Sequence, residues 1–449
     1  MNRIVLIGNG FDIAHGLKTR YEDFLIWYIK QKLDNLICQN RTQNKDCLCT
    51  ISRQESISLY PTDSPFIPRK NFEDLCSSHN LSKYIEIENF CKNSLGIDFY
   101  KEPFFQNITN SVATKGWVDI ENEYYRLLIE YSIKNNSDKS YEKIEELNKQ
   151  LQFLQAKLIE YLKCIDIDKN TKIDKIKKII YAPIIQAEIA NKSNALVEKY
   201  LESCFTEALN LQSQEPLSSL TLPYTKYKFS DHLTKKLTEY ENIATEEELS
   251  NWKRKPDIIL EEFNHTQRFN KERLELSPLF GLPDQVMLLS FNYTTTALNY
   301  KEGGICKVNY IHGELNNLDN SIIFGYGDEL DKYFKELKEY DNNKCLDNVK
   351  SIKYLETDNY KNILEFIESG LFQIYIMGHS CGNSDRTLLN TLFEHENCIS
   401  IKPYYYQKDD GTDNYTELIQ NISRNFTDMK LMRDRVVNKT YCKPLPQSK

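Results

Sequence analysis

A short glycine turn near the N-terminus has the residue types that bring backbone N–H groups against a phosphate. Gly8-Asn9-Gly10 follows the all-apolar run Ile4–Ile7 directly, and the amphipathic stretch Phe11–Trp27 follows the turn. This order predicts a strand, a turn and a helix whose N-terminus can bind an anion. Glycine suits the turn because a side chain would keep a phosphate away from the backbone. The third glycine of the full dinucleotide fingerprint is absent, so the turn also fits a plain strand–helix corner.

Four other polar or glycine-rich motifs follow apolar runs later in the chain. The carboxyl ends of parallel strands meet at one edge of a sheet, where open α/β proteins bind their ligands. A single motif of this kind can follow a strand by chance, but five of them at the same edge of a sheet are much less expected by chance. We therefore predict one ligand-binding cleft at this edge. The later motifs are FNYT (291–294), HGE (312–314), GYGD (325–328) and GHSCGNSD (378–385).

Six short apolar runs are predicted to be the strands that position these motifs. Their β-branched and aliphatic residues are typical of strands buried on both faces of a parallel sheet. We therefore predict an α/β fold with a doubly wound parallel sheet of about six strands and helical crossovers. The predicted strands are Ile4–Ile7, Gln285–Phe291, Cys306–Ile311, Ser321–Phe324, Phe372–Met377 and Cys398–Lys402.

A long segment of different composition separates the first predicted strand from the other five. It is rich in Lys, Glu, Asn and Leu, and it contains few glycines. Apolar residues at helical spacing in Tyr141–Leu162 and Ile173–Asn210 predict long amphipathic helices, whereas residues 40–70 are typical of a loop. We predict a nucleotide-binding domain of residues 1–30 plus 280–449, interrupted by a mainly α-helical insertion domain of residues 31–279.

Length and charge limit the classes of function. The 449 residues are too many for one simple core, which agrees with a domain carrying a large insertion. The net charge of −8 does not favour non-specific binding to nucleic acid. No apolar run approaches the roughly 20 residues needed to cross a bilayer, and Asn9 and Asp12 interrupt the apolar N-terminus, unlike in a signal peptide. We expect a cytoplasmic protein that contacts no membrane.

Twelve cysteines are scattered along the chain, and none forms a Cys-x-x-Cys pair. Without a secretion signal, we predict reduced thiols rather than disulfides. Cys47, Cys49, Cys76 and His79 lie near one another in the sequence, but their spacing does not match the usual zinc sites. We therefore expect no bound metal.

The order of the motifs resembles the AbiH family of bacterial abortive-infection proteins. More distantly, the order is similar to the sirtuin-like NAD-binding superfamily. The resemblance covers the N-terminal strand and helix and roughly residues 285–400, and it includes Asp119 and Glu121 of the insertion. It rests on GNGFD (8–12), W-x-D-x-E (117–121), SFNYT (290–294), IHG (311–313), FGYG (324–327) and GHSCGNSD (378–385).

The sirtuin-like resemblance implies roles for the matching residues. In that superfamily, a strand-end Asn and a His act on the ribose next to nicotinamide, and these match Asn292 and His312. The first turn would hold the pyrophosphate with Gly8, Asn9, Gly10 and Phe11. The late turn would serve the adenosine side with Gly378, His379, Ser380 and Asp385.

These residue types suit cleavage of the nicotinamide–ribose bond of NAD+. That reaction builds positive charge on the ribose, as in other glycosyl transfers with oxocarbenium-like transition states. Histidine titrates near neutral pH, so we assign His312 as the general base. Asn292 can orient water or ribose without adding charge, and Asp12 can bind a ribose hydroxyl or steady the cation.

Each assignment also has a structural alternative. His312 and His379 both lie beside glycines and fit simple turns. His15 would lie one turn inside the first helix, facing either the cleft or the core. The residues that also fit helix caps are Asp12, Asn292 and Asp385.

The resemblance therefore predicts an antiphage effector that hydrolyses NAD+ to nicotinamide and ADP-ribose. Zinc-bearing sirtuin deacylases carry two Cys-x-x-Cys pairs, and their absence here disfavours removal of acyl groups from lysine. The alternatives are a nucleotide-binding sensor without turnover, an ADP-ribosyl transferase, or a nuclease, although no acidic metal triad is evident. A phage-derived trigger and a homo-oligomer are further expectations.

Overall fold

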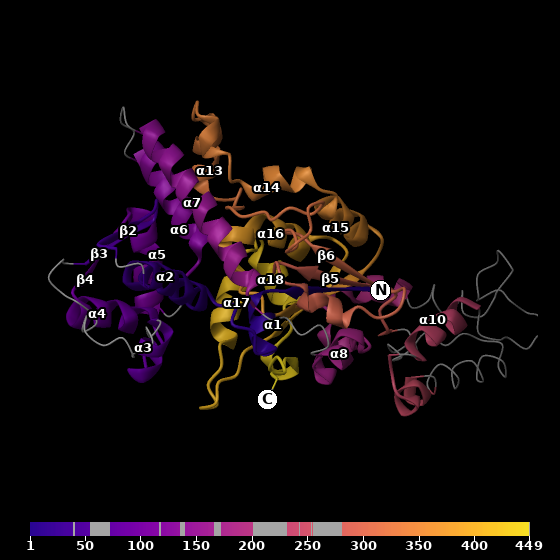
Figure 1. The fold of residues 1–449 in the computed structure, drawn as a ribbon. Coiled ribbons are helices and arrows are strands. Elements are labelled where there is room, and N and C mark those ends of the chain that lie inside the picture. Colours follow the sequence, from indigo (N-terminus) through magenta and orange to yellow (C-terminus); the bar gives the residue numbers. More distant parts are fainter. Residues whose placement is uncertain are drawn as a thin grey trace, which may run out of the picture.

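A parallel sheet of five strands forms the centre of the computed structural model (Figure 1). The structure describes residues 1–38, 41–53, 72–115, 118–134, 140–165, 172–200, 231–241, 243–252, 254 and 281–448. The strands lie in the spatial order β6-β5-β1-β7-β8. Their bounds are β1 (Asn2–Ile7), β5 (Val286–Ser290), β6 (Cys306–Tyr310), β7 (Phe372–Met377) and β8 (Cys398–Tyr404).

β1 is the central strand, and both of its faces are buried. Ile4 and Leu6 point into one apolar cluster, and Val5 and Ile7 point into the cluster on the opposite face. This alternation follows from the two-residue period of a strand. A strand segment buried on both faces is mostly apolar, which is why the run Ile4–Ile7 could be recognised in the sequence.

The register brings the ends of the strands together. Ile7 pairs with Ser290 of β5 and with Met377 of β7, so the loops after these strands begin side by side. From β1, the chain adds β5 and β6 on one side and then β7 and β8 on the other. The order therefore reverses beside β1, at the position where open α/β sheets bind ligands.

Helices cover both faces of the sheet. On one face, α15, α16, α17 and α18 contribute apolar side chains to the cluster that contains Ile4. On the other face, α1 and α8 pack with the cluster that contains Val5. The helices that cover the sheet are α1 (Asn9–Ala14), α8 (Asp174–Tyr181), α15 (Asn359–Glu368), α16 (Arg386–Glu394), α17 (Tyr415–Arg424) and α18 (Met429–Arg435). Between β6 and β7, the chain also forms α13 (Lys332–Glu339) and α14 (Lys350–Lys353).

The segment between β1 and β5 contributes most of another apolar cluster and contains a second sheet. This antiparallel sheet has the order β2-β3-β4, and it places strands in part of the predicted loop of residues 40–70. Its strands are β2 (Gln43–Lys45), β3 (Cys49–Arg53) and β4 (Ile97–Lys101), and the helices are α2 (Tyr21–Cys38), α3 (Phe72–Ser78), α4 (Tyr84–Leu95), α5 (Pro103–Lys115), α6 (Ile120–Ile129), α7 (Ser140–Lys163) and α10 (Asp231–Glu241).

The helix predicted for Tyr141–Leu162 is confirmed by α7, whereas two other predicted helical stretches are interrupted. The stretch Phe11–Trp27 is two helices, because the chain turns at Gly16, whose φ of 79° is in the left-handed region. The stretch that begins at Ile173 ends its helix at Tyr181, shortly before Pro183, which cannot continue the hydrogen-bond ladder. Two short 3-10 helices follow, a helix resumes over residues 194–200, and residues 201–210 lie outside the described residues.

The predicted strand Ser321–Phe324 was also wrong. These residues form no strand and pair with none of the sheet, which has five strands rather than about six. Ile323 and Phe324 are nevertheless buried, each in a different apolar cluster. Burial alone explains their apolar character, and this is why the run resembles a strand in the sequence.

In the described residues, no helix is long and apolar enough to cross a membrane.

Candidate active site

A cavity of about 520 Å³ opens at the carboxyl edge of the sheet, where the strand order reverses. Its size is in the range of small-molecule and cofactor sites. The loops after β1, β5, β6 and β7 line it, together with residues of α2, α6, α7 and α17. Ten of the eleven predicted site residues line this cavity, namely Gly8, Asn9, Gly10, Asp12, Asn292, His312, Gly378, His379, Ser380 and Asp385.

The glycine turn after β1 packs directly on the loop after β7. A Cβ atom on Gly8 would lie 2.5 Å from the Cα of His379, and one on Gly378 would lie 2.1 Å from the backbone N of Phe11. The N–H groups of Gly8, Gly10 and Phe11 donate to backbone carbonyls at 3.2, 2.9 and 2.8 Å. These three donors are therefore occupied, and the glycines let two loops approach each other. Their role at a pyrophosphate stays a prediction.

Phe11 is the predicted site residue that does not line the cavity. Its ring is fully buried, with its centroid 4.7 Å from that of His15 and 5.3 Å from that of Tyr300. His15 is also part of this core, because Nδ1 contacts the carbonyl oxygen of Phe11 at 2.7 Å and Nε2 contacts the hydroxyl of Tyr300 at 2.5 Å. The structure thus assigns both rings to the support beneath the turn.

Asp12 is a buried carboxyl group at the wall of the cavity. Its Oδ2 accepts a hydrogen bond from the hydroxyl of Thr294 at 2.6 Å, whereas its Oδ1 has no partner. Burial raises the pKa of Asp12 to about 6, although hydrogen bonds from Thr294 and neighbouring side chains oppose this shift. An unpartnered buried oxygen is costly unless a ligand or water satisfies it. Oδ1 of Asp12 is therefore a buried acceptor without a partner at the wall of the cavity.

Asn292 joins the loop after β5 to the glycine turn. Its Nδ2 donates to the carbonyl oxygen of Gly8 at 2.9 Å. The short helix that follows, Thr295–Tyr300, has Thr294 rather than Asn292 at its N-cap. Asn292 lines the cavity and holds the turn that carries Asp12.

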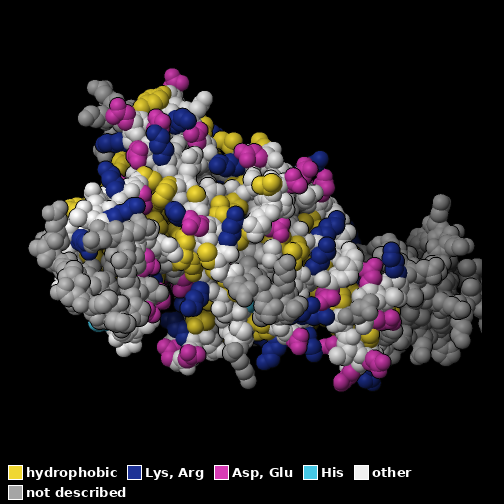
Figure 2. Space-filling view, viewed as in Figure 1, with side chains coloured by type: hydrophobic (Ala, Val, Ile, Leu, Met, Phe, Trp, Pro, Cys, Tyr) yellow, Lys and Arg dark blue, Asp and Glu magenta, His cyan; other side chains and the backbone are white. Residues whose placement is uncertain are grey.

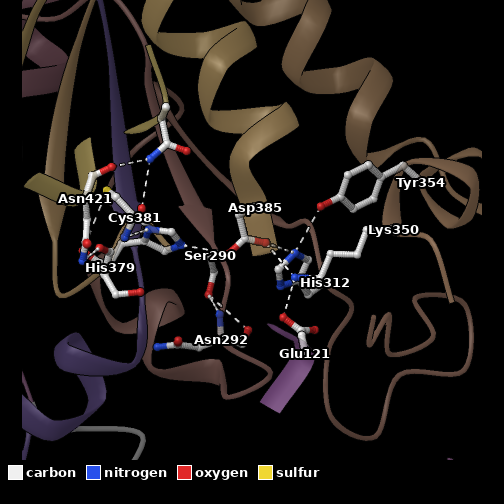
Figure 3. Close-up of polar contacts among 12 residues, drawn as sticks. Glu121, Ser290, Asn292, His312, Lys350, Tyr354, His379, Cys381, Asp385 and Asn421 are labelled. Atoms are coloured by element: carbon white, nitrogen blue, oxygen red, sulfur yellow. Dashed lines mark hydrogen bonds and ion pairs between the residues drawn. The ribbon is translucent and has the colours of Figure 1, made fainter. Parts of the chain in front are cut away.

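His312 and Asp385 form a buried pair beside the cavity (Figure 3). The Nε2 atom of His312 lies 3.2 Å from Oδ1 of Asp385 and 3.2 Å from the hydroxyl of Tyr354. An ionised carboxylate only accepts hydrogen bonds, so the Nε2 proton is the one that satisfies Asp385, and Nδ1 is left as an acceptor. Burial and the nearby ammonium group of Lys350 lower the pKa of His312 to about 4, and the ring is neutral at pH 7.

His379 contacts the other oxygen of Asp385. Its Nδ1 accepts from the backbone N–H of Cys381 at 3.0 Å, which places the ring proton on Nε2. That Nε2 lies 3.5 Å from Oδ2 of Asp385. Asp385 therefore lies between two histidines, as Figure 3 shows.

Lys350 is a buried cation that sequence reasoning missed. Its Nζ lies 2.7 Å from Oδ1 of Asp385 and 2.7 Å from Oε2 of Glu121. The ammonium group holds the pKa of Asp385 well below its usual range despite burial, whereas burial raises the pKa of Glu121 to about 7. A lysine at the start of a short helix has no sequence signal that separates it from an exposed lysine.

Two motifs of the sequence act as supports of this cluster. Asp119 is the N-cap of α6 and accepts from the backbone N–H of Asn122 at 2.9 Å. In the GYGD motif, the N–H of Gly325 donates to Oε1 of Glu121 at 3.0 Å. Asp119 and Glu121 both line the cavity, so α6 of the insertion contributes to the site. Trp117 of the same motif lies outside the described residues.

Two exposed arginines, Arg20 and Arg424, also line the cavity. They come from the segment before α2 and from the end of α17, more than 400 residues apart and too far for spacing to connect them. On the face of the molecule in Figure 2, side chains of both charges are interspersed.

Among the described residues, no group of three or more His, Cys, Asp or Glu side chains is arranged to hold a metal ion. The buried acidic cluster instead contains the ammonium group of Lys350, at 2.7 Å from two carboxylates.

A family model described as Bacteriophage abortive infection AbiH matches residues 4–406. The chain belongs to the AbiH family. The match begins in β1 and ends just after β8, so it includes the insertion as well as the sheet. Membership of the AbiH family implies a part in defence against bacteriophage by abortive infection. No curated protein and no solved structure matches the chain, and the sirtuin-like resemblance stays a prediction.

Proposed function

We propose that this AbiH-family chain acts in abortive infection by binding NAD+ in the cavity and hydrolysing its nicotinamide–ribose bond. The proposal rests on the distribution of charged groups in the cavity. Asp12, which is buried, offers an unpartnered carboxyl oxygen, whereas Arg20 and Arg424 are exposed. NAD+ has a matching polarity, because a positively charged nicotinamide riboside is joined to an anionic pyrophosphate.

In the proposed reaction, Asp12 stabilises the charge that develops on the ribose. The bond to nicotinamide breaks with its electron pair on the leaving nitrogen, and the ribose gains positive charge. A carboxylate in a buried site stabilises such a charge more strongly than it would in water. Water then adds to the ribose and loses a proton, so the products are nicotinamide, ADP-ribose and one proton.

Asp12 is also the better candidate for the base that accepts this proton. A general base is most effective when its pKa lies near the working pH. The pKa of Asp12 is about 6, whereas that of His312 is about 4. We therefore replace the predicted general-base role of His312 with an orienting role, in which its Nδ1 accepts a hydrogen bond from water or from a ribose hydroxyl.

The arginines take the part that the glycine turn was predicted to play at the pyrophosphate. Three N–H groups of that turn already donate to backbone carbonyls, and α1 has only six residues. Guanidinium groups form bidentate bonds with phosphate oxygens. We propose that Arg20 and Arg424 bind the pyrophosphate at the mouth of the cavity.

Comparison of binding with turnover tests the proposal. NAD+ affinity by calorimetry and release of nicotinamide would be measured for the wild-type protein and for Asn292→Ala and His312→Ala. The exposed Asn93 of α4 supplies a matched control, Asn93→Ala. We expect both site variants to lose more than about 100-fold in turnover while binding weakens far less.

The possible outcomes separate the alternatives. Binding of NAD+ without release of nicotinamide by the wild-type protein would overturn the enzymatic proposal and leave a sensor. Release of nicotinamide without matching free ADP-ribose would indicate transfer of ADP-ribose to an acceptor. If the wild-type protein shows no binding and no turnover of NAD+, NAD+ is rejected as the ligand.

A further inference from the structure

Lys350 joins two parts of the chain at the site. It begins α14, its side chain is fully buried, and its Nζ lies 2.7 Å from carboxylates of both Asp385 and Glu121. Asp385 belongs to the motif after β7, whereas Glu121 belongs to α6 of the insertion. A buried ammonium group is costly unless it is paired and hydrogen-bonded. The two carboxylates meet this requirement.

The position of Lys350 has a consequence for the two histidines. Asp385 can accept from both imidazoles only while it is ionised, since a protonated carboxyl would donate one hydrogen bond instead. Without Lys350, Asp385 and Glu121 would be two buried carboxylates without a cation between them, and one would be driven to bind a proton. The ammonium group therefore keeps Asp385 an acceptor.

We propose that Lys350 is a positioning residue, which holds Asp385 ionised and oriented so that Asp385 fixes the Nε2–H tautomer of His312. Glu121 anchors Lys350 from the insertion, so the insertion completes the site rather than merely covering it. The tautomer leaves Nδ1 of His312 as the acceptor for water or a ribose hydroxyl. Only this last step rests on the proposed function.

Histidine-selective ¹⁵N NMR tests the proposal without any need for turnover. The His312 signals are assigned by their loss in His312→Ala, and the ring is titrated in the wild-type protein, Lys350→Met and Asp385→Asn. Lys353 is half-buried on the same helix, and Lys353→Met is the matched control. Near-ultraviolet circular dichroism checks that each variant is folded.

The proposal predicts a different change in each of the two variants. In Lys350→Met, the pKa of His312 rises from about 4 by more than about one pH unit, because a positive charge near the ring is lost while Asp385 or Glu121 keeps a negative one. In Asp385→Asn, the side chain can donate to the ring as well as accept from it, so the preference that an acceptor-only carboxylate gives to the Nε2–H tautomer is lost. Lys353→Met retains the wild-type pKa and tautomer. Asp385→Asn keeps the proposal testable if Lys350→Met does not fold.

Unchanged His312 signals in Lys350→Met, or an unchanged tautomer in Asp385→Asn, would overturn the proposal. Turnover supplies a second readout if the protein hydrolyses NAD+, with kcat lowered more than about 30-fold in Lys350→Met and KM changed less than about threefold. If the wild-type protein does not hydrolyse NAD+, the proposed function fails, and the NMR result still decides the role of Lys350.

Discussion

Asp12→Asn is expected to stabilise the protein at neutral pH while it abolishes turnover. The wild-type carboxyl group is 1% exposed, and its pKa rises on folding from 3.8 to about 6. In the pH range between these values, the folded state binds more protons than the unfolded state, so stability falls as pH rises. A rise of this size corresponds to about 3 kcal/mol of lost stability at pH well above 6.

The assay is urea unfolding of the wild-type protein and Asp12→Asn at several pH values. From pH 5 to pH 8, the unfolding free energy of Asp12→Asn should increase by about 1.4 kcal/mol relative to that of the wild-type protein. The asparagine keeps an acceptor for Thr294, and any cost of its buried NH₂ group does not depend on pH. Asp98 is exposed on β4, so Asp98→Asn should show no such trend.

A difference between Asp12→Asn and wild type that stays constant from pH 5 to pH 8 would refute the reasoning. It would mean that Asp12 is already ionised at pH 5 in the folded protein. The carboxylate would then have an unseen partner, and Asp12 would be too weak a base for the proposed role.

Three further predictions concern packing, thiols and substrate binding. Gly378→Ala should lower the unfolding free energy by more than about 3 kcal/mol, because its Cβ would meet the N of Phe11 at 2.1 Å; Gly411→Ala, with a similar φ but no atom within 4 Å, should cost only about 1–2 kcal/mol, and equal losses would contradict the packing. Among the described cysteines, maleimide at pH 7 should label the exposed Cys164 first, because burial raises the pKa of Cys398 to about 12; mass spectrometry that finds Cys398 labelled first would contradict this. Arg424→Ala should raise KM for NAD+ about tenfold with little change in kcat, whereas Arg433→Ala on α18 should not, and equal effects would exclude a pyrophosphate contact.

The sheet was predictable because its strands obey a simple physical constraint. Strand segments buried on both faces are mostly apolar, as Ile4–Ile7 of β1 and Ile374–Met377 of β7 are, although Arg3 and Gln373 are buried in the same strands. The same rule misled at Ser321–Phe324, where apolar residues are buried without strand pairing. Periodicity cannot separate a paired strand from a buried extended segment.

The sequence predicted which residues gather at the site, but not the contacts that they make there. Polar residues after parallel strands gather at one edge, which brought together Asp12, Asn292, His312 and Asp385. No such rule connects Lys350 to these residues, since its partners lie 35 and 229 positions away. The low pKa of His312 likewise depends on burial and on that cation, and its residue type alone suggests a base near neutral pH.

The most direct measurement is the consumption of NAD+ by the purified wild-type protein, with nicotinamide and ADP-ribose quantified in the same reaction. It would be made with and without lysate from phage-infected cells, and with Asp12→Asn as the inactive comparison. The account predicts equal amounts of both products from the wild-type protein and none above background from the variant. Failure of the wild-type protein to release nicotinamide under either condition, or equal release by Asp12→Asn, would contradict it.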